Sequence, residues 1–306
     1  MFAALRHSLL PACGILTFAA VAPAQSVEPP RIAVISAFEP ELTKLLAATQ
    51  VTERRVINGR THYLGTLAGQ PVVLLLSGMS IVNATMVTQA LVDKLPVSAI
   101  VFSGIAGGVN PDLHVGDVTV PAQWANYQEQ VFARQTSTGW DSSNTAGAYP
   151  NFGMMFPRGL QIVSASGMPD ATVRRFWFDA DSASLERARA VARSVHLERC
   201  TAAGACLEHA PRIVVGGRGV SGPTFVDNTA YREYVWKTFQ ADALDMESAA
   251  VAVVAYTNHI PFVAFRSLSD LAGGGSGSNE VRTFGRLAAD NSATVVMAYL
   301  KSLPPR

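Results

Sequence analysis

Two kinds of hydrophobic pattern alternate along most of this chain. Short unbroken apolar runs rich in Val and Ile are typical of strands buried on both faces, whereas apolar residues spaced three to four apart indicate amphipathic helices. The unbroken runs predict strands at 32–37, 71–76, 99–103, 117–121, 212–217, 241–245 and 262–267, with a hairpin over 55–67. The spaced pattern predicts helices at 39–48, 82–95, 185–195, 229–239 and 280–300, and another that begins at Glu247.

Strands separated by helices indicate an α/β fold. We predict a three-layer sandwich in which helices cover both faces of a mostly parallel or mixed central sheet. The length suits one large domain or two small ones, and we predict a single domain over residues 25–306. Residues 126–168 are rich in Ser, Thr, Gly, Asn and aromatic residues. We interpret them as a long excursion within this domain, whose aromatic residues suit either a local core or a lid or partner-subunit wall.

Residues 1–24 have the features of a cleaved signal peptide. Arg6 and His7 supply a positive start, positions 9–21 are mostly apolar, and a small-residue cleavage site ends at Ala24. Pro11 interrupts the apolar run, which is also shorter than the roughly 20 residues of a membrane-spanning helix. We therefore expect an exported protein, periplasmic or secreted, without a membrane anchor.

Export changes the interpretation of the cysteines. Cys13 lies in the signal peptide, which leaves Cys200 and Cys206 as a pair in an oxidising compartment. We predict a disulfide between these two residues. Metal ligation is the less favoured alternative, because no second Cys pair and no His at a metal-binding spacing accompany them. We expect neither a metal nor an organic cofactor.

The charge of the chain is nearly balanced. Its 24 Lys and Arg residues and 23 Asp and Glu residues give a formal net charge of +1. A balanced charge does not favour nucleic acid or a membrane surface as a partner. We therefore expect neither, and look for a site that binds a small molecule.

Carboxylates stand at the ends of two predicted strands. Asp245-Met246-Glu247 follows one strand, and Asp270 follows the next. In open α/β sheets the carboxyl ends of strands line the ligand-binding crevice, so these side chains are expected to face one cavity. Glu41 lies in the first turn of a helix after Pro40, where the helix dipole favours an anion. Taken singly, Glu41 and Asp270 are better explained as ordinary helix-terminal acids.

A glycine-rich segment, Ser-Gly-Ile-Ala-Gly-Gly at 103–108, follows another apolar run. We predict a turn there, in which backbone N–H groups approach a ligand closely. The segment lacks the Lys-Ser/Thr of a P-loop and the full spacing of a dinucleotide-binding loop.

Taken in order, these segments resemble the nucleoside phosphorylase and nucleosidase superfamily, most closely the 5′-methylthioadenosine/S-adenosylhomocysteine nucleosidases. The resemblance covers residues 31–127 and 212–300. It rests on the segments 32–41, 77–78, 104–108, 115–117, 225–226, 245–247 and 266–270. It implies a fold of the phosphorylase and nucleosidase type, a nucleoside as the small-molecule partner, and a homo-oligomer in which a neighbouring subunit completes the site.

The resemblance also implies roles for single residues. Glu41 would orient and deprotonate the attacking water, and Asp270, supported by Ser269 and Arg266, would protonate N7 of a purine. Six further residues would contact the substrate. Ala106 and Gly107 would line the wall of the site, Phe225 and Val226 would contact the purine, and Met246 and Glu247 would contact the ribose.

These roles agree with the chemistry of N-glycosidic cleavage, which places positive charge on the sugar and negative charge on the departing base. A phosphorylase would bind phosphate with arginines, yet no Arg lies in 32–43 or 76–108. We therefore favour hydrolysis of a purine nucleoside of the methylthioadenosine or adenosylhomocysteine type. A phosphate-dependent phosphorylase and a non-catalytic nucleoside-binding or storage protein are the alternatives.

Overall fold

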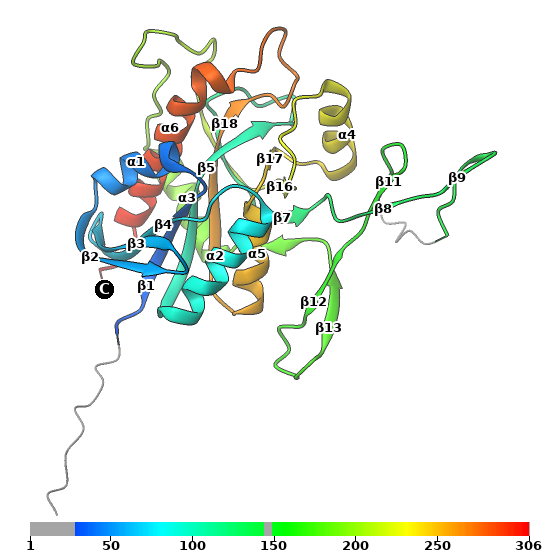
Figure 1. The fold of residues 1–306 in the computed structure, drawn as a ribbon. Coiled ribbons are helices and arrows are strands. Elements are labelled where there is room, and N and C mark those ends of the chain that lie inside the picture. Colours follow the sequence, from blue (N-terminus) through cyan, green and yellow to red (C-terminus); the bar gives the residue numbers. More distant parts are fainter. Residues whose placement is uncertain (1–27, 144–148, 306) are drawn as a thin grey trace, which may run out of the picture.

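Twelve strands form one mixed sheet in the part of the chain that the computed structural model describes, residues 28–143 and 149–305 (Figure 1). The predicted signal peptide lies outside these residues. Nine of the strands follow one another across the sheet: β14 (Phe178–Asp179), β7 (Gln123–Asn126), β16 (Arg218–Ser221), β17 (Ala243–Asp245), β5 (Val97–Gly108), β1 (Arg31–Ser36), β4 (Gln70–Leu76), β3 (Arg60–Leu67) and β2 (Gln50–Ile57). The remaining three are β18 (Phe262–Asp270), which pairs with β5, β6 (Val118–Val120), which pairs with β18, and β15 (Ile213–Val215), which pairs with β6.

Parallel pairs join β1, β4, β5 and β18, and antiparallel pairs flank this group on each side. β1 runs parallel to both β4 and β5, and β18 runs parallel to β5. β2, β3 and β4 form an antiparallel meander, and β17 is antiparallel to β5. The prediction of a mixed sheet is therefore confirmed, and the carboxyl ends of β1, β5 and β18 meet at one edge.

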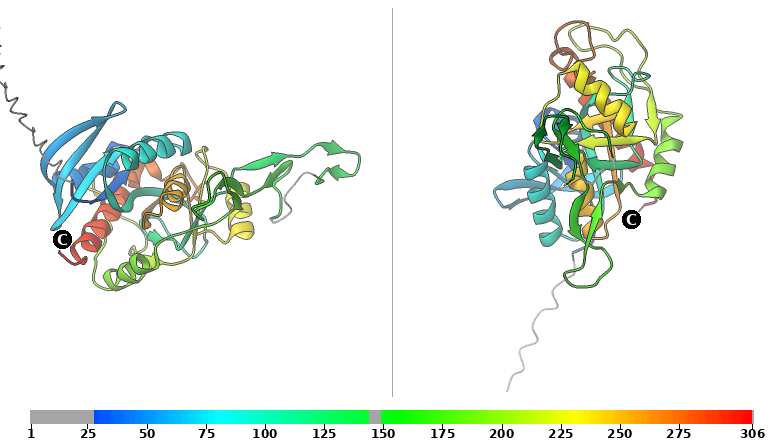
Figure 2. Two further views of the ribbon diagram at one scale, coloured as in Figure 1. Left: turned by 90° about the horizontal axis from the view of Figure 1, so that it is seen from below. Right: turned by 90° about the vertical axis from the view of Figure 1, so that its right-hand side faces the viewer.

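Helices cover both faces of the sheet (Figures 1 and 2). On one face, α2 (Ile81–Lys94) and α5 (Ser248–Thr257) pack on a core that includes Ile35, Leu75 and Phe102. On the other face, α1 (Glu39–Ala47), α3 (Ser182–Ala192) and α6 (Val281–Lys301) pack on a second core. Alternating strand residues supply the two cores, which makes the predicted three-layer sandwich.

Strand β5 corrects the prediction of a glycine turn at 103–108. The strand continues to Gly108, and its last residues pair with β18 and β17. Glycine is needed at position 104 because a Cβ there would overlap the Arg266 guanidinium and the Glu41 carboxylate. The glycines thus permit side chains from other elements to cross the strand closely, without ending it.

Two further differences concern strand limits. β18 extends to Asp270, three residues beyond the predicted end, so the acid lies on the strand itself. β16 was not predicted, because it is short and follows two glycines. Its Gly219 lies where a Cβ would overlap the ring of Trp124, so this strand lacks the apolar side chains that mark the others.

The excursion consists of small hairpins and not of loop alone. β8 (Gln130–Phe132) pairs with β11 (Met155–Pro157), β9 (Gln135–Thr136) with β10 (Gly139–Trp140), and β12 (Leu160–Val163) with β13 (Thr172–Arg175). The arm formed by β8 to β11 projects from the body (Figures 1 and 2). At its base, Tyr149, Phe152 and Met155 pack against α4 (Thr229–Phe239). These three residues therefore belong to a local core.

Cys200 and Cys206 form a disulfide, as predicted. Within the described residues, no helix is both long and apolar enough to span a membrane.

Candidate active site

A cavity of about 190 Å³ opens where the carboxyl ends of the central strands meet. Four carboxylates from three separate segments line it, namely those of Glu41, Asp245, Glu247 and Asp270. All four residues are at most 5% exposed. The expectation that the acids of the 245–247 segment and Asp270 share one crevice is therefore met, and Glu41 lies there as well.

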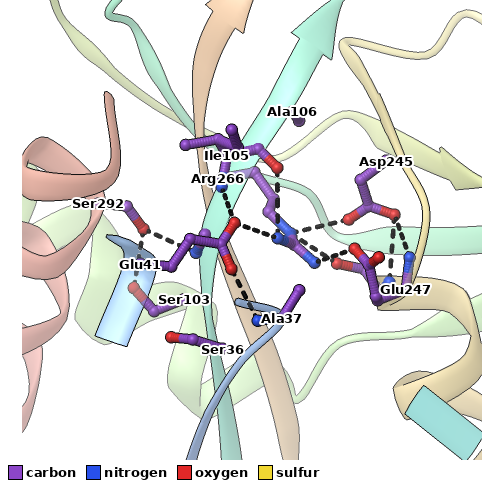
Figure 3. Close-up of polar contacts among 12 residues, drawn as sticks. Ser36, Ala37, Glu41, Ser103, Ile105, Ala106, Asp245, Glu247, Arg266 and Ser292 are labelled. Atoms are coloured by element: carbon purple, nitrogen blue, oxygen red, sulfur yellow. Dashed lines mark hydrogen bonds and ion pairs between the residues drawn. The ribbon is translucent and has the colours of Figure 1, made fainter. Parts of the chain in front are cut away.

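Glu41 projects from α1 toward β5 (Figure 3). Its Oε2 accepts a hydrogen bond from the Ala37 N–H at 2.7 Å, and its Oε1 accepts one from the Ile105 N–H at 2.8 Å. Burial raises the pKa of this carboxyl, against the opposing effects of Arg266 and the backbone donors. A carboxylate with a raised pKa is a stronger base, which suits the removal of a proton from water.

Asp270 is the last residue of β18. Its Oδ2 accepts a hydrogen bond from the Ser269 hydroxyl at 2.7 Å, and its Oδ1 accepts one from the Ala272 N–H at 2.8 Å. Burial raises the pKa of Asp270, and the hydrogen bonds partly offset this effect. The side chain therefore holds a proton to a higher pH than a solvated aspartate does, as a proton donor must.

Arg266 does not take the place that the sequence suggested, beside Asp270 and the substrate. It is fully buried and is not among the residues that line the cavity. Residues 266 and 270 are four apart on one strand, which separates their backbones by about 13 Å. The guanidinium instead faces Glu41, Asp245 and Glu247 (Figure 3).

The surroundings of Arg266 explain how a cation is tolerated at this depth. Its Nε donates to the Ser248 hydroxyl at 2.9 Å, and its Nη1 donates to the Ile105 carbonyl at 3.3 Å. The guanidinium carbon lies 4.1 Å from the centroid of the Phe102 ring, a cation–π contact. A buried charge needs such partners together with opposite charges, and here three carboxylates supply the latter.

Glu247 lies at the turn between β17 and α5. Its Oε1 accepts a hydrogen bond from the Ser80 N–H at 2.7 Å. Burial and the neighbouring Asp245 raise its pKa to about 7, although Arg266 opposes the shift. Ser80 adopts a φ of 79°, a left-handed conformation that a serine rarely takes. Such strain is typical of functional sites, and here it directs a backbone donor at the carboxylate.

The other residues with an implied substrate contact also line the cavity: Ala106, Gly107, Phe225, Val226 and Met246. Phe225 is 57% exposed and stands at the mouth, whereas Val226 is buried. Phe38, Met79 and Val281 add apolar surface that the sequence did not indicate. These three come from loops and helix ends, where no periodic pattern marks a residue as part of a site.

Asp245 is the carboxylate of the cavity for which the sequence indicated no role. The sequence signal that could have assigned Asp245 to the site is its position in the Asp-Met-Glu segment, where it is the carboxylate nearest to Glu247. Among the described residues, no arginine or lysine lines the cavity. In the same part of the chain, no group of three or more His, Cys, Asp or Glu residues could hold a metal ion.

Comparisons with known proteins agree with this geometry. The family model described as the phosphorylase superfamily matches residues 31–301. The 5′-methylthioadenosine/S-adenosylhomocysteine nucleosidase of Tolumonas auensis is 31% identical over 274 residues, which span 89% of this chain and 100% of the relative.

Solved structures are similar over the same extent. The nucleosidase of the same description from Neisseria meningitidis, in complex with methylthio-immucillin-A, has a TM-score of 0.65 at 27% identity, over 89% of this chain and 99% of its own. The futalosine hydrolase of Helicobacter pylori, with a TM-score of 0.66, 20% identity and coverage of 90% and 98%, shares the fold. Because the family model spans nearly all of the described chain and the relatives match along their whole length, this chain belongs to the phosphorylase superfamily.

Proposed function

We propose that this protein hydrolyses the N-glycosidic bond of purine nucleosides of the 5′-methylthioadenosine and S-adenosylhomocysteine type, which yields a free purine and the corresponding sugar. One observation carries the proposal: Glu41 and Asp270, a buried base and a buried acid, line the same cavity. Glu247 adds a third carboxylate to that cavity, suited to accept hydrogen bonds from ribose hydroxyls.

The reaction uses these groups in different ways. As the bond between the sugar and the base lengthens, positive charge develops on the sugar ring, and the nearby carboxylates stabilise it. Asp270 transfers a proton to the purine, so that the base departs as a neutral molecule. Glu41 accepts a proton from the water that attacks the sugar carbon.

Water is favoured over phosphate as the nucleophile by the charge of the cavity. Four carboxylates line it, whereas none of its described lining residues is an arginine or a lysine. Arg266, the nearest guanidinium, is buried and engaged with Glu41, Asp245 and Glu247. A phosphate dianion would therefore meet repulsion without the bidentate partner that phosphate sites use.

The substrate class is supported by the relatives and by the cavity walls. The similar proteins named above are described as nucleosidases for 5′-methylthioadenosine and S-adenosylhomocysteine. Phe38, Met79, Ile105 and Val281 give the cavity an apolar surface on which a thioether substituent can pack.

The test is a substrate panel. Purified protein is incubated with adenosine, inosine, methylthioadenosine and S-adenosylhomocysteine, with and without phosphate, and free base is measured. We expect release without phosphate, greatest for the two thioether nucleosides. Release that requires phosphate would establish a phosphorylase instead. Saturable binding of a nucleoside without release would indicate a storage protein.

Variants connect the activity to the two acids. We expect Asp270→Asn and Glu41→Gln each to reduce kcat at least a hundredfold, the usual contribution of a general acid or base. Circular dichroism and the melting temperature report whether each variant is folded. A folded Asp270→Asn variant with an unchanged rate would remove Asp270 from the role of proton donor.

We further propose that the protein is exported and cleaved after Ala24. The disulfide between Cys200 and Cys206 supports this location, because such bonds persist in oxidising compartments. Fractionation of expressing cells and sequencing of the mature N-terminus test the proposal. A cytoplasmic protein that retains its first residues would contradict it.

Homo-oligomerisation is a separate proposal. Val82 and Met86 on α2 are 75% and 53% exposed, and Met79 at the cavity is 59% exposed. A neighbouring subunit on this surface would cover these side chains and narrow the cavity mouth. Light scattering during gel filtration gives the mass in solution, and a monomer at micromolar concentration would refute the proposal.

A further inference from the structure

We propose that Asp245 is a positioning residue that holds Arg266 away from Glu41, so that Glu41 stays free to accept a proton. The inference rests on the proposed function and deepens it. Asp245 is the cavity carboxylate for which the sequence indicated no role, and it contacts both Arg266 and the turn that carries Glu247 (Figure 3).

The distances around Arg266 are unequal. Nε lies 2.8 Å from Asp245 Oδ2, whereas Nη1 lies 3.6 Å from Glu41 Oε1 and Nη2 lies 3.5 Å from Glu247 Oε2. The Coulomb energy of an ion pair depends on separation, which favours the first pair. The Nε–H itself donates to Ser248, so Asp245 Oδ2 accepts no hydrogen bond from the described residues and acts on the guanidinium through its charge. One guanidinium thus serves three carboxylates, and Asp245 is the closest of them.

Asp245 is itself fixed by its other oxygen. Oδ1 accepts hydrogen bonds from the Ser221 hydroxyl at 2.5 Å and from the N–H groups of Glu247 and Ser248, each at 3.1 Å. Ser221 lies beside Asp245 in the parallel pairing of β16 with β17. The carboxylate therefore joins two strand ends, the first turn of α5 and the guanidinium in one rigid arrangement.

Removal of the charge at position 245 releases Arg266 toward the other two acids. Asp245→Asn keeps the shape and the Oδ1 acceptor, but it replaces the negative charge 2.8 Å from Arg266 Nε with a neutral amide. The guanidinium then pairs more closely with Glu41 and Glu247. The charged and titratable groups of this cluster are Glu41 from α1, Asp245 from β17, Glu247 from the turn before α5 and Arg266 from β18.

The expected effect has a definite sign. A closer cation lowers the pKa of a carboxyl, and the loss of the neighbouring anion lowers the pKa of Glu247 further. Glu41 becomes a weaker base that ionises at lower pH. We expect Asp245→Asn to reduce kcat for methylthioadenosine at least tenfold and to move the acidic limb of its pH profile down by about one unit.

Two variants separate positioning from support of the fold. Asp245→Glu keeps the negative charge and should leave the acidic limb within about 0.3 units of wild type, a small part of the shift that a displaced charge causes. Asp117→Asn is the matched control, since Asp117 is a buried carboxylate outside the cavity that accepts from the backbone of His114 and Arg212. Asp117→Asn should lower the stability of the fold without shifting the acidic limb of the pH profile. The proposal would be overturned if Asp245→Asn lowered kcat without shifting the acidic limb of the pH profile. It would also be overturned if Asp245→Asn and Asp245→Glu changed kcat and the acidic limb equally.

A second measurement does not depend on catalysis. Carboxyls with raised pKa values make the folded protein lose stability as the pH rises through those values. The fall in Tm between pH 5 and pH 8 should therefore be smaller in Asp245→Asn than in wild type, and unchanged in Asp117→Asn. If the wild-type protein releases no base from any nucleoside, the proposed function fails, and this comparison alone decides whether Asp245 governs the cluster. An equal fall in Tm between pH 5 and pH 8 in wild type and in Asp245→Asn would refute the proposed role of Asp245.

Discussion

Replacement of Glu247 by glutamine should stabilise this protein at high pH. The carboxylate is 5% exposed, and its surroundings raise its pKa from 4.5 to about 7. Burial is the largest cause, Asp245 and Glu41 act in the same direction, and Arg266 and the Ser80 N–H act against it. A glutamine at this position has nearly the same shape as the protonated acid and carries no charge at any pH.

The sign and size follow from proton linkage. Because the folded pKa lies above the unfolded one, the native state loses stability as the pH rises from 4.5 through 7. The difference of about 2.5 units, at 1.36 kcal/mol per unit, amounts to about 3 kcal/mol, most of it lost between pH 5 and pH 8. Glu247→Gln removes this loss, so its stability relative to wild type should rise by about 2.5 kcal/mol over that interval.

Urea unfolding at pH 5 and pH 8 measures the effect directly. The free energy of unfolding of Glu247→Gln minus that of wild type is compared at the two pH values, with a check that the m-values agree. Glu39→Gln, at an exposed position of α1, is the control and should show no change with pH. If the advantage of Glu247→Gln does not grow with pH, burial does not dominate at this carboxyl and the interpretation is wrong. Activity should fall at every pH, because the ribose contact is weakened.

Three further predictions concern other parts of the site and the fold. Gly104→Ala places a methyl group against Arg266 and the Glu41 carboxylate, so kcat should fall at least a hundredfold, as for loss of a base; wild-type kcat would contradict the packing. Phe225→Ala should raise KM about tenfold with kcat nearly unchanged, because stacking on a base contributes about 1–3 kcal/mol; an unchanged KM would exclude stacking. In a Cys200→Ser, Cys206→Ser double variant the free energy of unfolding should be lower by about 2 kcal/mol. Its kcat should equal that of wild type, since the disulfide lies outside the cavity; lost activity in the folded variant would show coupling to the site.

The positions of Glu41 and Asp270 at one edge of the sheet could be predicted from the sequence. Each follows an apolar run that forms a buried parallel strand, and parallel strands present their carboxyl ends at the same edge. The helix 229–239 was predicted with its observed limits, because its apolar spacing is a local signal. Local patterns sufficed wherever neighbouring residues along the chain decide the structure.

Contacts between distant segments decided the rest. Arg266 and Asp270 are close in sequence, but β18 carries a register shift between Leu268 and Asp270, and the strand separates the two side chains. The guanidinium therefore meets Glu41 and the acids of another strand end. No local sequence pattern predicts how closely the guanidinium approaches these carboxylates.

The hydrophobic pattern by itself determined the α/β class, the order of most elements and the strand ends at which acids gather, because burial of apolar residues depends on periodicity along the chain. The tertiary structure alone decided which acids share one guanidinium, how deeply each is buried and that 103–108 is a strand. These properties arise from distances across the fold, and both desolvation and charge interaction depend on those distances.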